Sequence, residues 1–281
     1  MLALGTMTAG AQPRNAPDVS AILMRVGERV QEYYARAVSV ICLESVSLRQ
    51  LGTDLTSDGS PVRRLVFELR IGWQPPADGS GPPEASVLRQ IVTIDGRPPR
   101  PKDKPRCGDP PPVLPDTLEF LLPGKQEDTV FRLAGRGKAG GHPALMIDYQ
   151  SRQRGPGTLT EHDDDPDCIS MEVPGMARGR IWIDEQTADV LRLDEHLIGP
   201  VDMRWSKGST SMSRFQPVVI ERLDSTVTFR PVAFTEPEER VMLPAQVDSM
   251  RVIRNLGDPR MRTTQRFSNY RRFTTDARIV E

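Results

Sequence analysis

The chain has 281 residues, of which 37% are hydrophobic and 27% charged, which is typical of a globular protein rather than a disordered one. Its 37 basic and 38 acidic residues give a net charge of −1, which excludes an overall field that would attract nucleic acid or an anionic membrane. The 26 prolines and 22 glycines favour many short elements joined by turns. No run approaches the roughly 18 apolar residues of a transmembrane helix.

The first residues have the pattern of the back half of a secretory signal. Residues 1–7 are mostly apolar, and residues 8–12 offer small residues at the spacing of a cleavage site. The basic segment that opens such signals is missing, so we expect the true start to lie upstream. The alternative is a frayed, hydrophobic N-terminus. We therefore expect an exported protein, periplasmic or secreted, with a partial signal over residues 1–12 and a single β domain over residues 17–281.

A long amphipathic helix follows, with Asp18 as its candidate N-cap. Apolar residues recur at spacings of three and four and predict one stripe that must lie on an apolar surface, most simply a sheet. The members of this stripe are Ile22, Val26, Val30, Tyr33, Ala37 and Ile41.

From Cys42 onward the apolar period changes to two, which predicts strands. The alternation is cleanest over residues 64–73. A second short helix is expected at residues 115–122, before Pro123-Gly124, and polar surface loops at residues 97–115 and 152–168. Further strands are expected at residues 85–94, 129–136, 143–151, 178–184, 190–196, 215–229, 240–253 and 262–274. The sequence thus predicts a mainly β (α+β) fold of about ten strands without βαβ crossovers.

The cysteines are Cys42, Cys107 and Cys168, and no two of them form a CxxC pair. Cys107 and Cys168 lie in loop-like segments, so a disulfide between them is plausible in an exported protein, although the sequence does not fix the pairing. Cys42 lies in an apolar run and is expected to be a buried free thiol.

Few residues suggest chemistry. His142, His162 and His196 form no metal-binding motif, and the acidic run 161–167 lacks the spacing of a calcium loop. The glycines of 135–141 lack the pattern of a phosphate loop, and no GxSxG is present. Arginines are scattered along the strands, and we interpret them as a solvated sheet face rather than a phosphate-binding surface. We expect no catalytic residue, cofactor or metal.

One hairpin carries a family resemblance. Its pattern is Gly179-x-Ile181-x-Ile183-Asp184-x-x-Thr187-x-x-Val190-x-Arg192. It resembles the hairpin of periplasmic outer-membrane lipoprotein carrier and lipoprotein-sorting proteins. Met242-Leu243-Pro244, followed by Val247, resembles another strand start of that superfamily. Three further segments are similar to uncharacterised envelope proteins of this fold: Glu44-x₅-Gln50, the turn at residues 94–98 and the final strand at 267–273.

The resemblance implies a strongly curved, unclosed antiparallel half-barrel sheet with both helices on its concave side. In the best-known members of the family, the gap between sheet and helices takes acyl chains. The Cys-bearing loops of this chain are longer, and the ligand-gating arginine of the carriers has no counterpart that we can identify. The fold therefore carries over better than the activity.

The leading hypothesis is a non-enzymatic binding protein that shelters an apolar ligand, such as a lipid or a lipoprotein acyl chain, between sheet and helix. The alternatives are an envelope protein–protein interaction module with a filled core, and an unrecognised hydrolase. The residues expected to line the ligand cavity are apolar residues of two predicted strands, Leu65, Phe67, Leu69, Ile71, Trp73, Val219, Leu223, Val227 and Phe229. Ordinary core packing is the competing interpretation of these residues.

Overall fold

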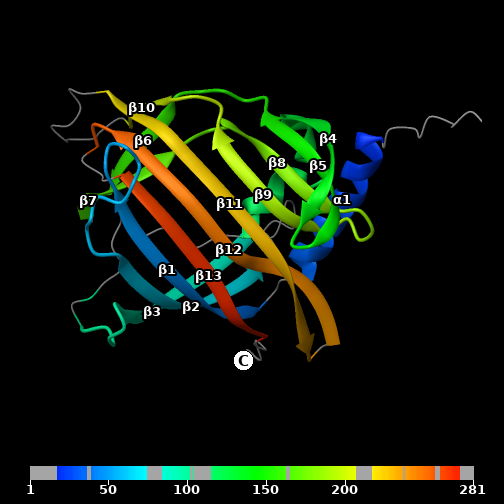
Figure 1. The fold of residues 1–281 in the computed structure, drawn as a ribbon, viewed down its shortest axis with the longest axis horizontal. Coiled ribbons are helices and arrows are strands. Elements are labelled where there is room, and N and C mark those ends of the chain that lie inside the picture. The colour runs from blue at the N-terminus through cyan, green and yellow to red at the C-terminus, as the bar shows by residue number, and fades with distance from the viewer. Residues whose placement is uncertain are drawn as a thin grey trace, which may run out of the picture.

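A computed structural model describes residues 18–36, 39–74, 84–101, 103, 115–162, 165–206, 217–236, 238–256 and 260–272. One helix, two short 3₁₀ helices and a 13-stranded sheet form the described part of the chain (Figure 1). The helical elements are α1 (Val19–Arg36), η1 (Pro115–Leu121) and η2 (Gln126–Asp128). The strands are β1 (Val40–Leu51), β2 (Arg63–Gln74), β3 (Glu84–Ile94), β4 (Thr129–Ala139), β5 (His142–Ser151), β6 (Gly157–His162), β7 (Asp165–Glu172), β8 (Ala177–Asp184), β9 (Val190–Leu197), β10 (Val201–Trp205), β11 (Val218–Thr235), β12 (Glu238–Arg254) and β13 (Arg260–Arg272).

The main path of the sheet has the order β3-β2-β1-β13-β12-β11-β9-β8-β5-β4, and every neighbouring pair along it is antiparallel. β10, β6 and β7 extend from β11 as a side branch, with β10 and β6 paired in parallel. The sheet is not closed into a barrel, and its path ends at β3 and β4. The predicted fold class, an unclosed antiparallel sheet under one long helix, is confirmed.

The side branch shows where the predicted strand count was wrong. Residues 152–168 were expected to be a loop, but β6 and β7 begin within this segment. Leu159 of β6 is fully buried against Met203 of β10 and Ile220 of β11 in an apolar cluster separate from the main core. β6 has only six residues, and β7 has eight and opens with Asp165-Pro166-Asp167, so their alternation is too brief to detect in the sequence.

The first helix ends earlier than its apolar stripe predicted. α1 stops at Arg36, and Ile41, the last predicted member of the stripe, lies in β1. Ser39 has a positive φ of 60°, so the chain turns there into an extended conformation. Val40, Cys42 and Glu44 are then all buried with the period of a strand.

α1 packs against one face of the sheet, here called the inner face; the opposite face is the outer face. The main core joins α1 and η1 to strands from both halves of the sheet. Val26 and Val30 on α1, Leu121 on η1 and Ile147 and Ile181 on the sheet are all nearly or fully buried. Because η1 packs here too, the prediction that both helices lie on the same side is confirmed.

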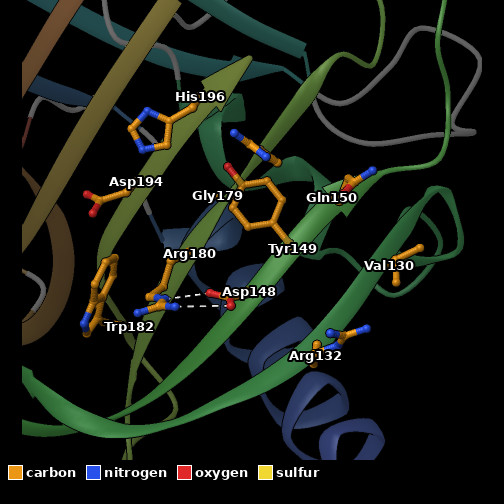
Figure 2. Close-up of a pocket in the computed structure, with 11 residues that line it drawn as sticks. Val130, Arg132, Asp148, Tyr149, Gln150, Gly179, Arg180, Trp182, Asp194 and His196 are labelled. Atoms are coloured by element: carbon orange, nitrogen blue, oxygen red, sulfur yellow. Dashed lines mark hydrogen bonds and ion pairs between the residues drawn. The ribbon is translucent and has the colours of Figure 1, made fainter. Parts of the chain in front are cut away.

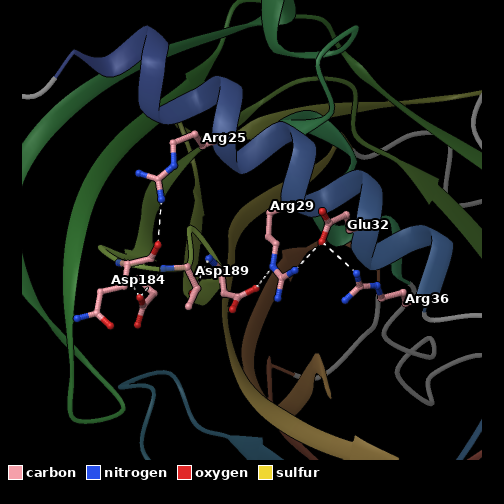
Figure 3. Close-up of polar contacts among 8 residues, drawn as sticks. Arg25, Arg29, Glu32, Arg36, Asp184 and Asp189 are labelled. Atoms are coloured by element: carbon pink, nitrogen blue, oxygen red, sulfur yellow. Dashed lines mark hydrogen bonds and ion pairs between the residues drawn. The ribbon is translucent and has the colours of Figure 1, made fainter. Parts of the chain in front are cut away.

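Polar contacts fix α1 to the turn between β8 and β9 (Figure 3). Arg25 donates to the backbone oxygen of Gln186 at 3.0 Å, and Arg29 donates to the Asp189 carboxylate at 2.6 Å. The turn is itself held by Asp184, whose carboxylate accepts the backbone N–H groups of Gln186 and Thr187 at 2.8 and 3.0 Å. We call the contacts of Arg25 and Arg29 with this turn the helix latch.

The packing around Gly179 explains why the hairpin pattern has a glycine at this position. A Cβ at this position would lie 1.9 Å from the backbone oxygen of Asp194 and 2.8 Å from the ring of Tyr149. Tyr149 lies directly opposite Gly179, which lies opposite Glu195, and the Tyr149 hydroxyl donates to Glu195 at 2.9 Å. A glycine in β8 therefore lets a side chain of β5 pass over it to β9.

Replacing Gly179→Ala should lower the free energy of unfolding by about 3 kcal/mol, because strand backbone and a buried ring must both move to make room. Urea denaturation measures this loss. Gly199→Ala is the matched control, since a Cβ there meets nothing within 4 Å. Equal stability of the two variants would contradict the close packing described for β8.

Candidate functional site

The residues predicted to line a cavity fall into different settings. Leu69 and Val227 are buried in the main core beneath α1, and Ile71 and Phe229 pack against it. Leu65 and Phe67 are buried in a separate cluster with Val46, Leu48 and Ile94. Val219 was predicted wrongly: the bulge in β11 sets it opposite Arg254, on the outer face, where it is buried. The side chain of Trp73 lies outside the described residues.

Leu223 marks the place where the inner face extends beyond the helix. No register shift separates it from Val227 along β11, so the two side chains share a face. Yet Val227 is buried under α1, whereas Leu223 is 37% exposed. Solvent therefore reaches apolar surface on the inner face at this point.

A row of polar residues crosses the inner face between Leu223 and the covered core. Glu195, Ser225, Ser249 and Thr263 lie directly opposite one another on β9, β11, β12 and β13. Thr263 is buried, and the other three are partly exposed. Burial raises the pKa of Glu195, although its hydrogen bond from Tyr149 opposes the shift. The inner face thus changes from apolar to polar at this row.

Glu44 is the centre of a buried polar network on the inner face. It is fully buried, and Arg89 of β3 donates to both of its carboxylate oxygens, at 2.9 and 3.0 Å. Gln265 of β13 donates to the same carboxylate at 2.8 Å, and the Arg89 guanidinium lies 3.7 Å from the centre of the Phe67 ring. Burial raises the pKa of Glu44, while Arg89 and Gln265 lower it.

Cys42 lies close to this network and beneath the helix. Its thiol is free and buried in the main core, as the sequence predicted. Burial raises the pKa of the Cys42 thiol to about 12, and the charge of Glu44 adds to the shift. Cys168 lies in β7 and Cys107 lies outside the described residues, so the disulfide between them stays a prediction.

The outer face carries a depression over β4, β5, β8 and β9, with a volume of about 680 Å³ (Figure 2). Its floor includes a row of alternating charge, because Arg132, Asp148, Arg180 and Asp194 lie opposite one another on successive strands. Arg180 donates to Asp148 at 2.6 and 3.2 Å (Figure 2). The remaining lining residues are Val130, Tyr149, Gln150, Arg178, Gly179, Trp182 and His196.

Arg192 pairs with the second acid of this face, Asp194, and packs against the Trp182 ring. Arg192 donates to both oxygens of Asp194 at 2.8 Å, and its guanidinium lies 4.7 Å from the centre of the Trp182 ring. Thr226 also donates to Asp194, at 2.9 Å. Sequence reasoning treated these arginines only as a solvated face, because the depression depends on which strands are neighbours.

Candidate catalytic and metal groups can also be located. His196 lies 3.0 Å from Asp224 through Nδ1, and the Asp224 carboxylate also contacts Arg222. His142 lies 3.9 Å from Asp184. Within the described ranges, no group of three or more His, Cys, Asp or Glu residues could hold a metal ion. The acidic run 161–167 lies partly outside the described residues. No helix in the described part of the chain is long and apolar enough to cross a membrane.

Comparisons with known proteins give structural matches only. No protein-family model and no curated protein matches the chain. One similar solved structure is described as an outer membrane lipoprotein-sorting protein domain from Vibrio parahaemolyticus, at 12% identity and a TM-score of 0.39, covering 90% of this chain and 94% of that one. A LolA superfamily protein from Nitrosomonas europaea matches at 8% identity and a TM-score of 0.38, covering 92% and 95% of the two chains. A DUF1329 family protein from Desulfovibrio piger matches at 11% identity and a TM-score of 0.42, covering 90% and 92%.

The buried network makes stability depend on pH in a defined direction. Arg89→Met should cost about 3 kcal/mol of unfolding free energy near neutral pH, because it leaves the Glu44 carboxylate buried without its cation. In that variant the pKa of Glu44 lies further above its value in the unfolded chain. The folded state therefore binds the proton first, and stability recovers as the pH falls below neutrality toward the ordinary pKa of a glutamate. Urea denaturation across this range should show no such recovery in Glu44→Gln/Arg89→Met, and an Arg89→Met deficit that stays constant with pH would contradict the account.

Cys42 gives a second test. With a pKa of about 12 and a buried position, its thiol should not react with a disulfide reagent in the native protein near pH 8. In denaturant one thiol per chain should react, since the predicted Cys107–Cys168 disulfide removes the other two. Three reactive thiols in denaturant would contradict the disulfide, and one in the native state would contradict the burial of Cys42.

Proposed function

We propose that this protein is an exported, non-enzymatic binding protein that holds an apolar ligand, such as a lipid or a lipoprotein acyl chain, on the inner face of its sheet beneath α1. The observation that supports this proposal most directly is the exposure of Leu223. This apolar side chain shares a face with the covered core, yet it is 37% exposed. An apolar tail that followed β11 from Leu223 toward Val227 would pass from solvent into the core. Export is supported by the signal-like pattern of residues 1–12.

The contacts between α1 and the sheet are of a kind that would let the helix move away and admit a ligand. The helix buries Ile22, Leu23, Val26, Val30 and Tyr34, but its polar contacts with the sheet are largely those of the helix latch. One of these is a partly exposed ion pair, Arg29 with Asp189, which contributes about 1 kcal/mol or less, and the other is a hydrogen bond to a backbone oxygen. Separating α1 from the sheet would therefore cost mainly the burial of its apolar stripe, and an acyl chain would restore that burial.

The chemistry of the ligand can be inferred from the apolar surface and the polar row that meet on the inner face. Each methylene that leaves water contributes about 0.8 kcal/mol, so several buried methylenes suffice for useful affinity without any catalytic residue. The polar row of Glu195, Ser225, Ser249 and Thr263 lies between Leu223 and the core, so it offers hydrogen bonds to a polar group of a ligand whose apolar parts contact both. The best fit is an amphiphile with its tail toward α1. The solved structures similar to this chain include the lipoprotein-sorting domain reported above.

A second candidate function is a protein-interaction module, favoured by the β3 edge of the sheet. On this strand Leu88 is 59% and Val92 41% exposed, and a groove of about 590 Å³ lies between residues 88–91 and the segment from Pro99 to Asp103. β4, the strand at the other end of the path, instead presents charged side chains, among them Arg132 and Arg136. Charge discourages strand pairing at an edge, and the β3 edge lacks this protection at its exposed positions.

A single substitution separates the two functions. Leu223→Asp should weaken binding of a fluorescent fatty acid with 16 carbons by about tenfold or more, because it places a carboxylate where the tail enters. Leu88→Asp, which changes an equally apolar and more exposed residue of the β3 edge, should leave fatty-acid affinity unchanged. Fluorescence titration of both variants, with unlabelled fatty acid as competitor, provides the measurement. Unchanged affinity in Leu223→Asp, or no saturable binding by the unmodified protein, would contradict the proposed function.

A further inference from the structure

We infer that the depression on the outer face is a second binding site, independent of the inner face, and that it takes a small anion carrying an apolar group. It lies across the sheet from α1, and apart from Tyr149 and Gly179 its lining residues are outward side chains of β4, β5, β8 and β9 (Figure 2). Its polar residues differ in whether they already have partners, and that difference determines which ligand the depression can accept.

Both acids of the depression are already neutralised. Asp148 is bound by Arg180 through two hydrogen bonds, and Asp194 is bound by Arg192 through two more and by Thr226 through a third. An acid held in this way has little remaining attraction for a cation. These pairs therefore fix the floor of the depression and leave it without free negative charge.

Two arginines of the lining are free. Arg132 on β4 and Arg178 on β8 are exposed, and neither forms a hydrogen bond or ion pair with any other described residue. They flank β5 from its two sides, since Arg132 lies opposite Asp148 and Arg178 lies opposite Gln150. The two arginines lie on the strands that flank β5, and Gln150 lies on β5 between those strands, so together they can provide the donors that a carboxylate or phosphate requires.

An apolar wall adjoins these donors. Val130 lies opposite Gln150 and is 45% exposed, although it is a β-branched apolar residue at the rim of the depression. A ligand that places an anionic group between the arginines can rest an apolar group on Val130. Covering that side chain would then add hydrophobic burial to the charge-assisted hydrogen bonds.

Size and charge favour a small molecule over an acidic peptide. Because Arg180 and Arg192 already pair with Asp148 and Asp194, only Arg132 and Arg178 remain for a ligand, which matches one anionic group rather than the several charges of a polyacidic chain. A volume of about 680 Å³ is within the range of ordinary small-molecule sites. One anionic group with one compact apolar group satisfies both conditions.

The test uses the full chain and 1-naphthyl phosphate as the probe, with uncharged 1-naphthol for comparison. Calorimetry should show saturable binding of the phosphate, and affinity should fall by about tenfold or more in Arg132→Gln/Arg178→Gln. Arg136→Gln is the matched control, because Arg136 lies on β4, is exposed and lies outside the depression. It should bind like the unmodified protein. Amide signals of Gln150 and Gly179 should shift on titration, which locates the ligand in the depression.

Several results would overturn the inference. Binding that is equal in the double variant and the unmodified protein would place the phosphate elsewhere, and equal binding of 1-naphthol would remove the role of the anion. Vesicles of phosphatidylglycerol form a second arm. If flotation with these vesicles depends on Arg132 and Arg178 while 1-naphthyl phosphate does not bind, the arginines form a membrane-contact surface and the small-molecule site is wrong. Because Leu223 lies on the opposite face, failure here leaves the inner-face proposal standing.

Discussion

The arrangement depends on one constraint: a large, strongly curved sheet has an apolar inner face, and one amphipathic helix covers its centre. Val26 and Val30 of α1 supply the apolar stripe, and residues such as Ile147, Ile181 and Leu193 supply the surface beneath it. Burial of this kind is non-directional, so it specifies that α1 must cover the sheet but not where it stops. The helix latch and the hydrogen bond that Gln126 of η2 donates to the backbone oxygen of Leu23 provide the directional contacts that fix its position.

The two faces of the sheet accommodate charged side chains in different ways. On the inner face, isolated polar groups such as Glu44 are buried and must be fully paired, and Arg89 and Gln265 provide that pairing. On the outer face, charges of both signs alternate across strands and remain near water, where each pair contributes little. The side chains left over are therefore informative: Leu223 is apolar surface left uncovered, and Arg132 and Arg178 are cations without partners among the described residues.

Much of the fold could be predicted from local pattern, and most of the site could not. The spacing of Ile22, Val26 and Val30 predicted α1, and the alternation of residues 64–73 predicted β2, because each pattern repeats over several turns or residue pairs. β6, β7 and β10 escaped prediction because their alternation is brief. The contact of Glu44 with Arg89 spans 45 residues and depends on strand register, which the sequence does not display. The same reason hides the depression, since Arg132 and Arg178 are neighbours only through β5.

The central claim is that the inner face carries an apolar ligand, and native mass spectrometry of the full chain purified from its cells without detergent tests it most directly. The account predicts a population heavier than the chain by the mass of a lipid or acyl-bearing molecule, released on mild collisional activation. It also predicts that Leu223→Asp loses this population while keeping its fold. A bare chain mass under every gentle condition, with Leu223→Asp indistinguishable from the unmodified protein, would contradict the account.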